Sequence, residues 1–190
     1  MLEVYSNFFR NIQTHNAIMN IKRLLRAFAC VSILSMFVVD TAIHAAAPLT
    51  ATATSFLEIP SINLSVPLVV APFTGNTWDF SSLDDAAGFL DDLPMPGQGS
   101  NAIIGAHSEL DNRLPGPFYN LNHVKVNDEI IVTLKGTKYT YSVSKMWYVL
   151  PTDISPISPT RTDSLTLLTC AGYDQGVYTT RLVVRAELIS

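Results

Sequence analysis

Cysteine is scarce in this chain of 190 residues, which contains only Cys30 and Cys170. Two thiols form at most one bridge, so the sequence excludes a small scaffold held together by several disulfides. Charged residues are also few, at 15%, whereas hydrophobic residues make up 48%. This composition supports a packed core and excludes disorder over most of the chain. The length predicts a single domain.

Basic residues are absent from a long stretch of the chain. No Lys or Arg lies between Arg26 and Arg113, and the formal net charge is −4. Residues 48–112 carry eight carboxylates and no base, a net charge of −8, whereas residues 113–190 carry eight bases and six carboxylates, a net charge of +2. Because an acidic surface repels phosphate groups, we expect no nucleic-acid partner.

The hydrophobic run Ala27–Val39 has only 13 residues. At about 1.5 Å per residue, a helix of this length falls short of a hydrocarbon core of about 30 Å. A basic region at 22–26 precedes the run and three alanines follow it at 45–47, which is typical of a secretory signal peptide. If it is not cleaved, residues 24–47 could associate with a membrane as an anchor. Both alternatives give the remaining chain an extracytoplasmic location, secreted or at the cell surface.

The N-terminal part therefore divides into two segments. Residues 1–47 are predicted to be an N-terminal extension plus a signal peptide or membrane anchor, and the start at Met1 or Met19 is left open because Met19 alone would begin a signal peptide of ordinary length. The small polar residues at 50–55 (TATATS) predict a linker at 48–55. Residues 56–190 are then the folded domain.

The domain is predicted to be all-β. Short runs rich in Val, Ile, Leu, Thr and Tyr are separated by Pro, Gly, Asn and Asp, as in strands joined by turns. The expected strands are Phe56–Ile59, Leu64–Val70, Ala102–Ala106, Glu129–Leu134, Lys138–Tyr148, Ser164–Thr169 and Thr180–Leu188, with a hairpin turn at Gly136-Thr137. One helix is expected at Ser82–Leu93 and a shorter one near Pro117–Leu121. So many strands favour a closed or nearly closed antiparallel barrel, which leaves no exposed sheet edge.

A single cysteine remains in the domain, because Cys30 lies in the targeting segment. A lone thiol outside the cytoplasm indicates reactivity or intermolecular pairing. Cys170 follows the strand LTLLT, and we expect Ala171-Gly172 to break that strand and leave the thiol at its end. His107 likewise ends the strand NAIIGA. His123 lies in the polar segment NLNHV, which is typical of a surface turn, so His107 is the better catalytic candidate.

A cysteine nucleophile needs a thiolate, and an unperturbed thiol supplies only a few per cent of it at neutral pH. A nearby imidazole or guanidinium raises that fraction, and a further donor must stabilise the oxyanion formed when a carbonyl is attacked. Arg181 is the best donor candidate because it begins the strand TRLVVRAEL on the face opposite its apolar residues. Arg185 is the alternative on that face, and the loop residues Arg113 and Arg161 are weaker candidates than either.

Several strings in this order resemble those of the sortases. They are IPSINLSVPLV at 59–69, PGQGSNAIIGAHS at 96–108, GPFYNL at 116–121, PTD at 151–153, LLTC at 167–170 and YTTRLVV at 178–184. The resemblance covers roughly residues 57–188. It is nearer to class D, E or F sortases than to class B, because there is no large insertion before the cysteine.

The resemblance implies an eight-stranded barrel with a Cys-His-Arg site. Carried over, Cys170 is the nucleophile, His107 the general acid/base, Arg181 the donor for substrate and oxyanion, and Thr169 a substrate-binding residue. In sortases the cysteine cleaves an LPXTG-like C-terminal sorting signal of a surface protein after the threonine and passes the acyl group to an amino acceptor of peptidoglycan or a pilin. The loop Pro151–Asp163 corresponds to the loop that covers the sorting signal.

No metal or other cofactor is expected, because the spaced carboxylates that some sortases use for calcium are not reproduced upstream of His107. Two alternatives stay open from the sequence. One is an L,D-transpeptidase, although Cys170 lacks the S-x-G-C-[IV]-R context of that family. The other is a secreted β-barrel binding module or an inactive sortase-like domain.

Overall fold

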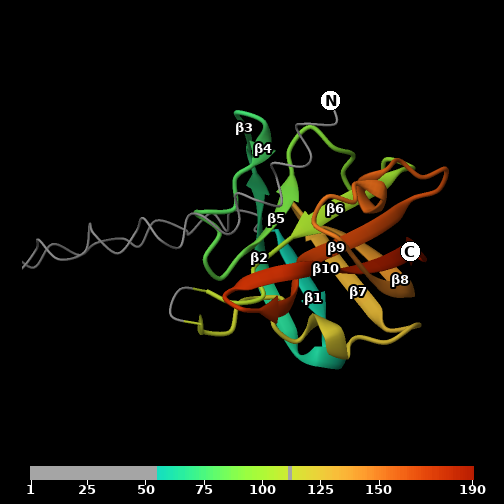
Figure 1. Cartoon of the computed structure of the whole chain (residues 1–190). Helices are drawn as coiled ribbons and strands as arrows, with labels where there is room; N and C mark the ends of the chain where they lie inside the picture. The colour runs from blue at the N-terminus through green and yellow to red at the C-terminus, as the bar shows by residue number, and fades with distance from the viewer. Residues whose placement is uncertain (1–54, 111–112) are drawn as a thin grey trace, which may run out of the picture.

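Alternating strands and tight turns account for most of the computed structural model, which describes residues 55–110 and 113–190. Eight strands close into a barrel in the order β1-β2-β5-β6-β9-β10-β8-β7, with β7 paired to β1 (Figure 1). The predicted all-β closed barrel of eight strands is confirmed, but it is not antiparallel throughout, because β2 pairs with β5 and β6 with β9 in parallel. The barrel strands are β1 (Phe56–Ile59), β2 (Leu64–Ala71), β5 (Ala87–Leu90), β6 (Asn101–Gly105), β7 (Glu129–Leu134), β8 (Thr137–Val149), β9 (Ser164–Asp174) and β10 (Val177–Leu188).

Shorter elements lie outside the eight barrel strands. Strands β3 (Phe73–Thr74) and β4 (Thr77–Trp78) form a separate hairpin, which projects from one end of the barrel in Figure 1. The described residues also include the short 3-10 helices η3 (Pro60–Ile62), η5 (Leu121–His123) and η6 (Ser155–Ile157). The short helix expected near residues 117–121 thus forms as η5, slightly later in the chain.

The predicted helix at Ser82–Leu93 is wrong, because this segment contains turns followed by β5. Asp84 has φ +40, which an α-helix does not accommodate. All four residues of β5 are buried, with Phe89 in the barrel core and Leu90 in a second cluster outside it. A strand covered on both faces is continuously apolar, so its sequence does not alternate and is easily confused with a buried helix.

The β7–β8 turn and the end of β9 also differ from expectation. The β7–β8 turn is Lys135-Gly136, one residue earlier than predicted, since Leu134 pairs with Thr137. Both turn residues have positive φ (48 and 90), as a two-residue hairpin turn requires. Strand β9 continues to Asp174 instead of ending before Ala171, because β10 pairs with it as far as Val177.

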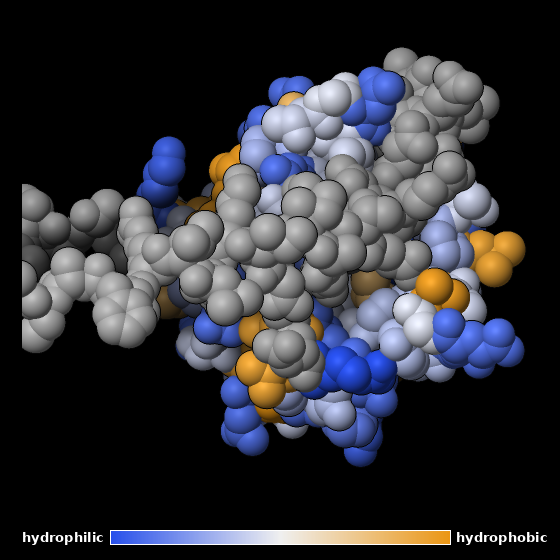
Figure 2. Space-filling view, turned by 60° about the vertical axis from the view of Figure 1, so that its left-hand side comes forward, coloured by the Kyte–Doolittle hydropathy of each residue, from blue (hydrophilic) through white to orange (hydrophobic). Residues whose placement is uncertain are grey.

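Two hydrophobic clusters organise the molecule. The larger one fills the barrel and includes Leu165, Leu167, Leu182 and Val184, while the smaller one lies on the outer face of the same strands and includes Leu168 and Val183. On the part of the surface seen in Figure 2, hydrophobic residues form small separate patches among hydrophilic ones.

The predicted targeting segment at 1–47 lies outside the described residues, as does the linker apart from Ser55. In the part of the chain that is described, no helix has the length and apolarity needed to cross a bilayer. The division of the N-terminal region stays a prediction.

Candidate active site

Strand register aligns the three residues expected to do chemistry. Cys170 of β9 is directly opposite Arg181 of β10, and residues opposite each other in a pair of antiparallel strands share one face. On the other side of β9, β6 runs parallel to it, with Gly105 aligned with Leu168. Continuing that register by two residues brings His107 level with Cys170. The register thus places His107, Cys170 and Arg181 in one row, in which Cys170 and Arg181 belong to paired strands and His107 follows the end of β6.

Cys170 was expected at a strand end, and this expectation is corrected by the extended β9. The neighbouring strand β6 is the one that ends at this level, at Gly105, so the chain leaves the sheet just before His107. The thiol is thus bordered by a strand on the Arg181 side and by a loop on the His107 side.

The row lies on the outer face of the barrel. Cys170 has the same strand parity as Leu168, and Arg181 the same as Val183, and both of these apolar residues belong to the outer cluster. Cys170 is 7% exposed and Arg181 only 1%. Burial raises the pKa of the Cys170 thiol above its ordinary value, while the Arg181 guanidinium acts in the opposite direction. Arg181 is thus the group that favours the thiolate at this site.

Arg181 itself is strongly desolvated. Burial lowers the pKa of its guanidinium, and a negative charge on Cys170 raises it. One of its terminal nitrogens donates to the backbone carbonyl of Thr180 at 2.9 Å. The free-energy cost of keeping a buried guanidinium charged falls when an anion forms beside it. Arg181 is therefore suited to stabilise a thiolate or an oxyanion.

The ring of His107 is held by a residue far away in the sequence. Its Nε2 lies 3.0 Å from the backbone carbonyl oxygen of Phe80, and because a carbonyl only accepts, the imidazole donates from Nε2 and leaves Nδ1 as the second ring nitrogen. The Phe80 ring packs on Gly105, where an added Cβ would lie 2.6 Å from a ring carbon. Phe80 thus contacts both the end of β6 and the imidazole that follows it.

Thr169 lies on the opposite face of β9 from the thiol. It is 5% exposed, and its hydroxyl donates to the carbonyl of Ala106 at 2.9 Å. Together with the bond from the Ala106 N–H to the Leu168 carbonyl at 3.3 Å, it fastens the chain just before His107 to β9. Its predicted contact with substrate stays a prediction.

Arg185, the alternative to Arg181, is four residues farther along β10 and pairs with Thr166. Its guanidinium donates to the carbonyl of Pro156 at 2.9 Å, and the Asn101 side chain donates to the same carbonyl at 3.0 Å. These bonds hold the loop Pro151–Asp163 on the outer face of the barrel. His123 lies at the end of η5 with an exposed side chain, as expected for a surface residue.

A cluster that sequence reasoning did not identify as a group joins the loop after His107 to the β9–β10 hairpin. Arg113 lies 4.0 Å above the ring of Tyr173 and 3.6 Å from the Glu109 carboxylate, and Tyr173 packs edge-on against Tyr178. Burial and the neighbouring Glu109 raise the pKa of Tyr178 to about 12. Arg113 was considered only as a distant catalytic candidate, and the structure gives it this structural contact instead.

Comparisons with known proteins identify the family. The sortase-domain model matches residues 57–189. The chain belongs to the sortase family. It is 28% identical over 135 residues to sortase A of Streptococcus agalactiae serotype III (strain NEM316), a match that covers 70% of this chain and 51% of that protein. The chain thus spans about half the length of this streptococcal relative.

Solved sortase structures share the fold. A lid mutant of sortase A from Corynebacterium diphtheriae matches with a TM-score of 0.60 and 33% identity, covering 73% of this chain and 70% of that one. Sortase C-1 from Actinomyces oris matches with a TM-score of 0.58 and 28% identity, covering 72% and 73%. The predicted sortase membership is confirmed, and the subclass stays a prediction.

Proposed function

We propose that the chain is a sortase-type cysteine transpeptidase, in which Cys170 is the nucleophile, His107 the general acid/base and Arg181 the oxyanion and substrate donor. The observation that carries the proposal is the row of these three residues on one face of a sortase-family barrel, with a desolvated guanidinium directly opposite a buried free thiol. Its substrates would be LPXTG-like sorting signals of surface proteins and an amino acceptor of peptidoglycan or a pilin.

The first half-reaction forms a thioester. The Cys170 thiol gives its proton to His107, its sulfur attacks the carbonyl carbon of the threonine of the sorting signal, and the negative charge that develops on the carbonyl oxygen is stabilised by Arg181. The C–N bond then breaks as His107 delivers a proton to the leaving amine. The acyl group remains on Cys170, and the C-terminal part of the substrate departs.

The second half-reaction reverses these roles. An amine attacks the thioester carbonyl, loses a proton to His107, and expels the Cys170 sulfur, which recovers a proton. The new peptide bond joins the surface protein to its acceptor. Because peptidoglycan and pilins lie outside the cytoplasm, the proposed function implies a site at the cell surface, in agreement with the targeting segment predicted at residues 1–47.

The test uses the full-length protein with a panel of quenched peptides containing LPXTG-type motifs, with and without triglycine. We expect a thioacyl adduct on Cys170 by intact mass spectrometry and a ligated product when triglycine is present. The Cys170→Ala variant serves as the control, since its fold should be unchanged and its adduct absent. A wild-type protein that binds peptides without forming the adduct would favour a binding module or an inactive sortase-like domain.

A further inference from the structure

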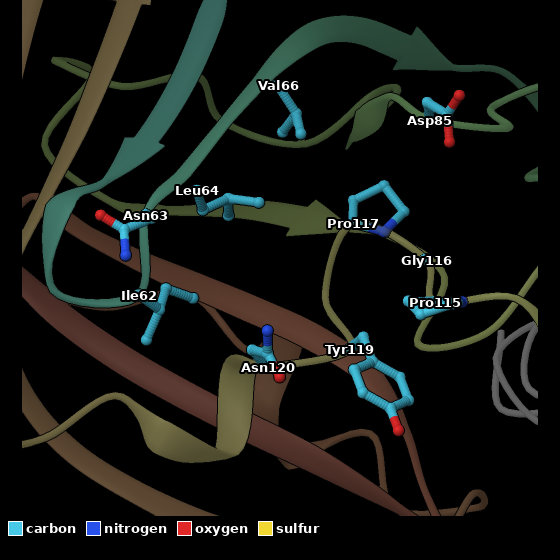
Figure 3. A pocket seen from close by; sticks show the side chains of 10 residues that line it. All are labelled: Ile62, Asn63, Leu64, Val66, Asp85, Pro115, Gly116, Pro117, Tyr119 and Asn120. Atoms are coloured by element: carbon cyan, nitrogen blue, oxygen red, sulfur yellow. The ribbon is translucent and has the colours of Figure 1, made fainter.

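A cavity of about 270 Å³ lies beside the loop that follows His107. Figure 3 shows it between the start of β2 on one side and the loop at 115–120 on the other, with Asp85 at its rim beyond Pro117. The lining residues are Ile62, Asn63, Leu64, Val66, Asp85, Pro115, Gly116, Pro117, Tyr119 and Asn120. We call it the rim cavity.

The wall of the rim cavity is in direct contact with the main chain of His107. At Gly116, an added Cβ would lie 2.5 Å from the His107 carbonyl oxygen and 3.1 Å from the His107 Cβ. The same loop is fixed by the Phe118 N–H, which donates to the His107 carbonyl at 2.9 Å. The rim cavity therefore lies next to the main chain of His107, and none of its lining residues belongs to β9 or β10.

The chemistry of the lining suits a primary ammonium group. Asp85 is the only charged residue among the lining residues, and its side chain is exposed and makes no ion pair with any other described residue. Asn63 and Asn120 are neutral polar residues of the lining, and Ile62, Leu64 and Val66 supply an apolar wall for a short aliphatic chain. An anionic ligand would be repelled by the carboxylate.

We propose that the rim cavity binds the amino acceptor, with the ammonium of the acceptor held by Asp85 before transfer. This inference rests on the proposed function and adds to it the location of the second substrate. An amine attacking a thioester on Cys170 must approach where His107 can take its proton, and the loop that lines the rim cavity contacts the main chain of that histidine. The shared chemistry is an unhindered primary ammonium, from a peptide N-terminus or from a lysine side chain.

The acceptor nitrogen loses two protons during the transfer step. The ammonium loses one proton to solvent as it leaves Asp85, and the neutral nitrogen attacks the thioester carbonyl carbon. A C–N bond forms while the C–S bond breaks. The second proton lost by the nitrogen passes through His107 to the departing Cys170 sulfur, which leaves the free enzyme ready for the next sorting signal.

The experiment separates acceptor binding from acylation in the full-length protein. Peptide cleavage without acceptor measures acylation and hydrolysis, and the dependence of ligation on acceptor concentration gives the half-saturation for triglycine and for Nα-acetyl-lysine methylamide. We expect Asp85→Asn to raise this half-saturation about threefold to fivefold, the size expected for one partly exposed charge pair, and Asp85→Lys to raise it further. Cleavage without acceptor should be unchanged.

The matched control is Asp84→Asn. Asp84 is the adjacent exposed carboxylate and does not line the rim cavity, and its φ of +40 suits asparagine. An equal effect of both variants, or no effect of Asp85→Asn, overturns the proposal, as does a change confined to cleavage without acceptor. A larger effect with triglycine identifies a peptide N-terminus as the acceptor, and a larger effect with Nα-acetyl-lysine methylamide identifies a lysine side chain.

Failure of the proposed function is distinguishable from failure of this inference. If the wild-type protein forms no thioacyl adduct, the transpeptidase proposal fails. Amine binding is then tested by titrating triglycine into isotopically labelled protein and following the amide signals of Gly116 and Asn120. Shifts that saturate in the wild type and are weakened in Asp85→Asn support the rim cavity as an amine site, and unchanged signals overturn it.

Discussion

The substitution Gly105→Ala tests whether the packing of Phe80 positions His107. Gly105 is the last residue of β6, and an added Cβ would lie 2.6 and 2.7 Å from two carbons of the Phe80 ring. Carbon atoms prefer separations of about 3.5–4.0 Å, so the ring must retreat by roughly 1 Å. Phe80 is 5% exposed and has little room to move without displacing its own main chain, whose carbonyl binds His107 at 3.0 Å.

Two effects are expected from this displacement. Overpacking of a buried cluster should cost about 1–3 kcal/mol of unfolding free energy, which lowers Tm by about 2–4 °C for each kcal/mol. A shift of about 1 Å in a catalytic group can cost 100-fold in rate. We therefore expect kcat/KM for peptide cleavage to fall by roughly tenfold to 100-fold at a temperature where the variant remains folded.

The matched control is Gly88→Ala. Gly88 pairs with Gly105 across β5 and β6, and its added Cβ would meet Leu83 at 2.9 Å and Ala71 at 3.0 Å instead of Phe80. The two variants overpack the same outer cluster, so both should be less stable than the wild type. Only Gly105→Ala should also slow the chemical step. If kcat is normal in Gly105→Ala, or falls equally in Gly88→Ala, Phe80 does not position the imidazole.

Three further results are expected, each with its own measurement. The Arg181→Gln variant should shift the pH profile of Cys170 alkylation by iodoacetamide to higher pH, because the guanidinium is the group that lowers the pKa of the buried thiol; a shift to lower pH would contradict this. Arg181→Lys should lose most of the transpeptidation rate, since a point charge replaces a planar fork, and near wild-type turnover would assign the donor role elsewhere. His123→Ala should leave turnover and Tm within error, because its side chain is exposed, and an inactive variant would reverse the choice of His107.

Local patterns were sufficient to predict most strands and to select the three residues that the strand register aligns in one row. Short runs of β-branched and aromatic residues bounded by turn residues located β1 and β7 with their observed bounds. His107 could be selected because it follows the end of an apolar strand, and Arg181 because it lies near the start of the strand TRLVVRAEL on the face opposite the apolar residues. This kind of inference uses only neighbours in the sequence.

The errors occurred where neighbouring strands decide the outcome. Residues 87–90 are a strand only because β2 and β6 pair with them on both sides, and nothing within the segment itself indicates those partners. Gly172 has φ +65 and would ordinarily end a strand, yet β10 pairs with β9 on both sides of it. In both cases tertiary pairing overrides the local preference.

The surroundings of His107 could not be predicted for the same reason. The Phe80 carbonyl that holds the imidazole comes from 27 residues earlier in the chain, and the rim cavity combines the start of β2, Asp85 and the loop at 115–120. These segments meet only because β6 lies between β5 and β9 in the closed barrel. A sequence can thus indicate which side chains carry the chemistry, whereas the groups that orient them, and the cavity from which an acceptor would approach, depend on the order in which the strands close the barrel.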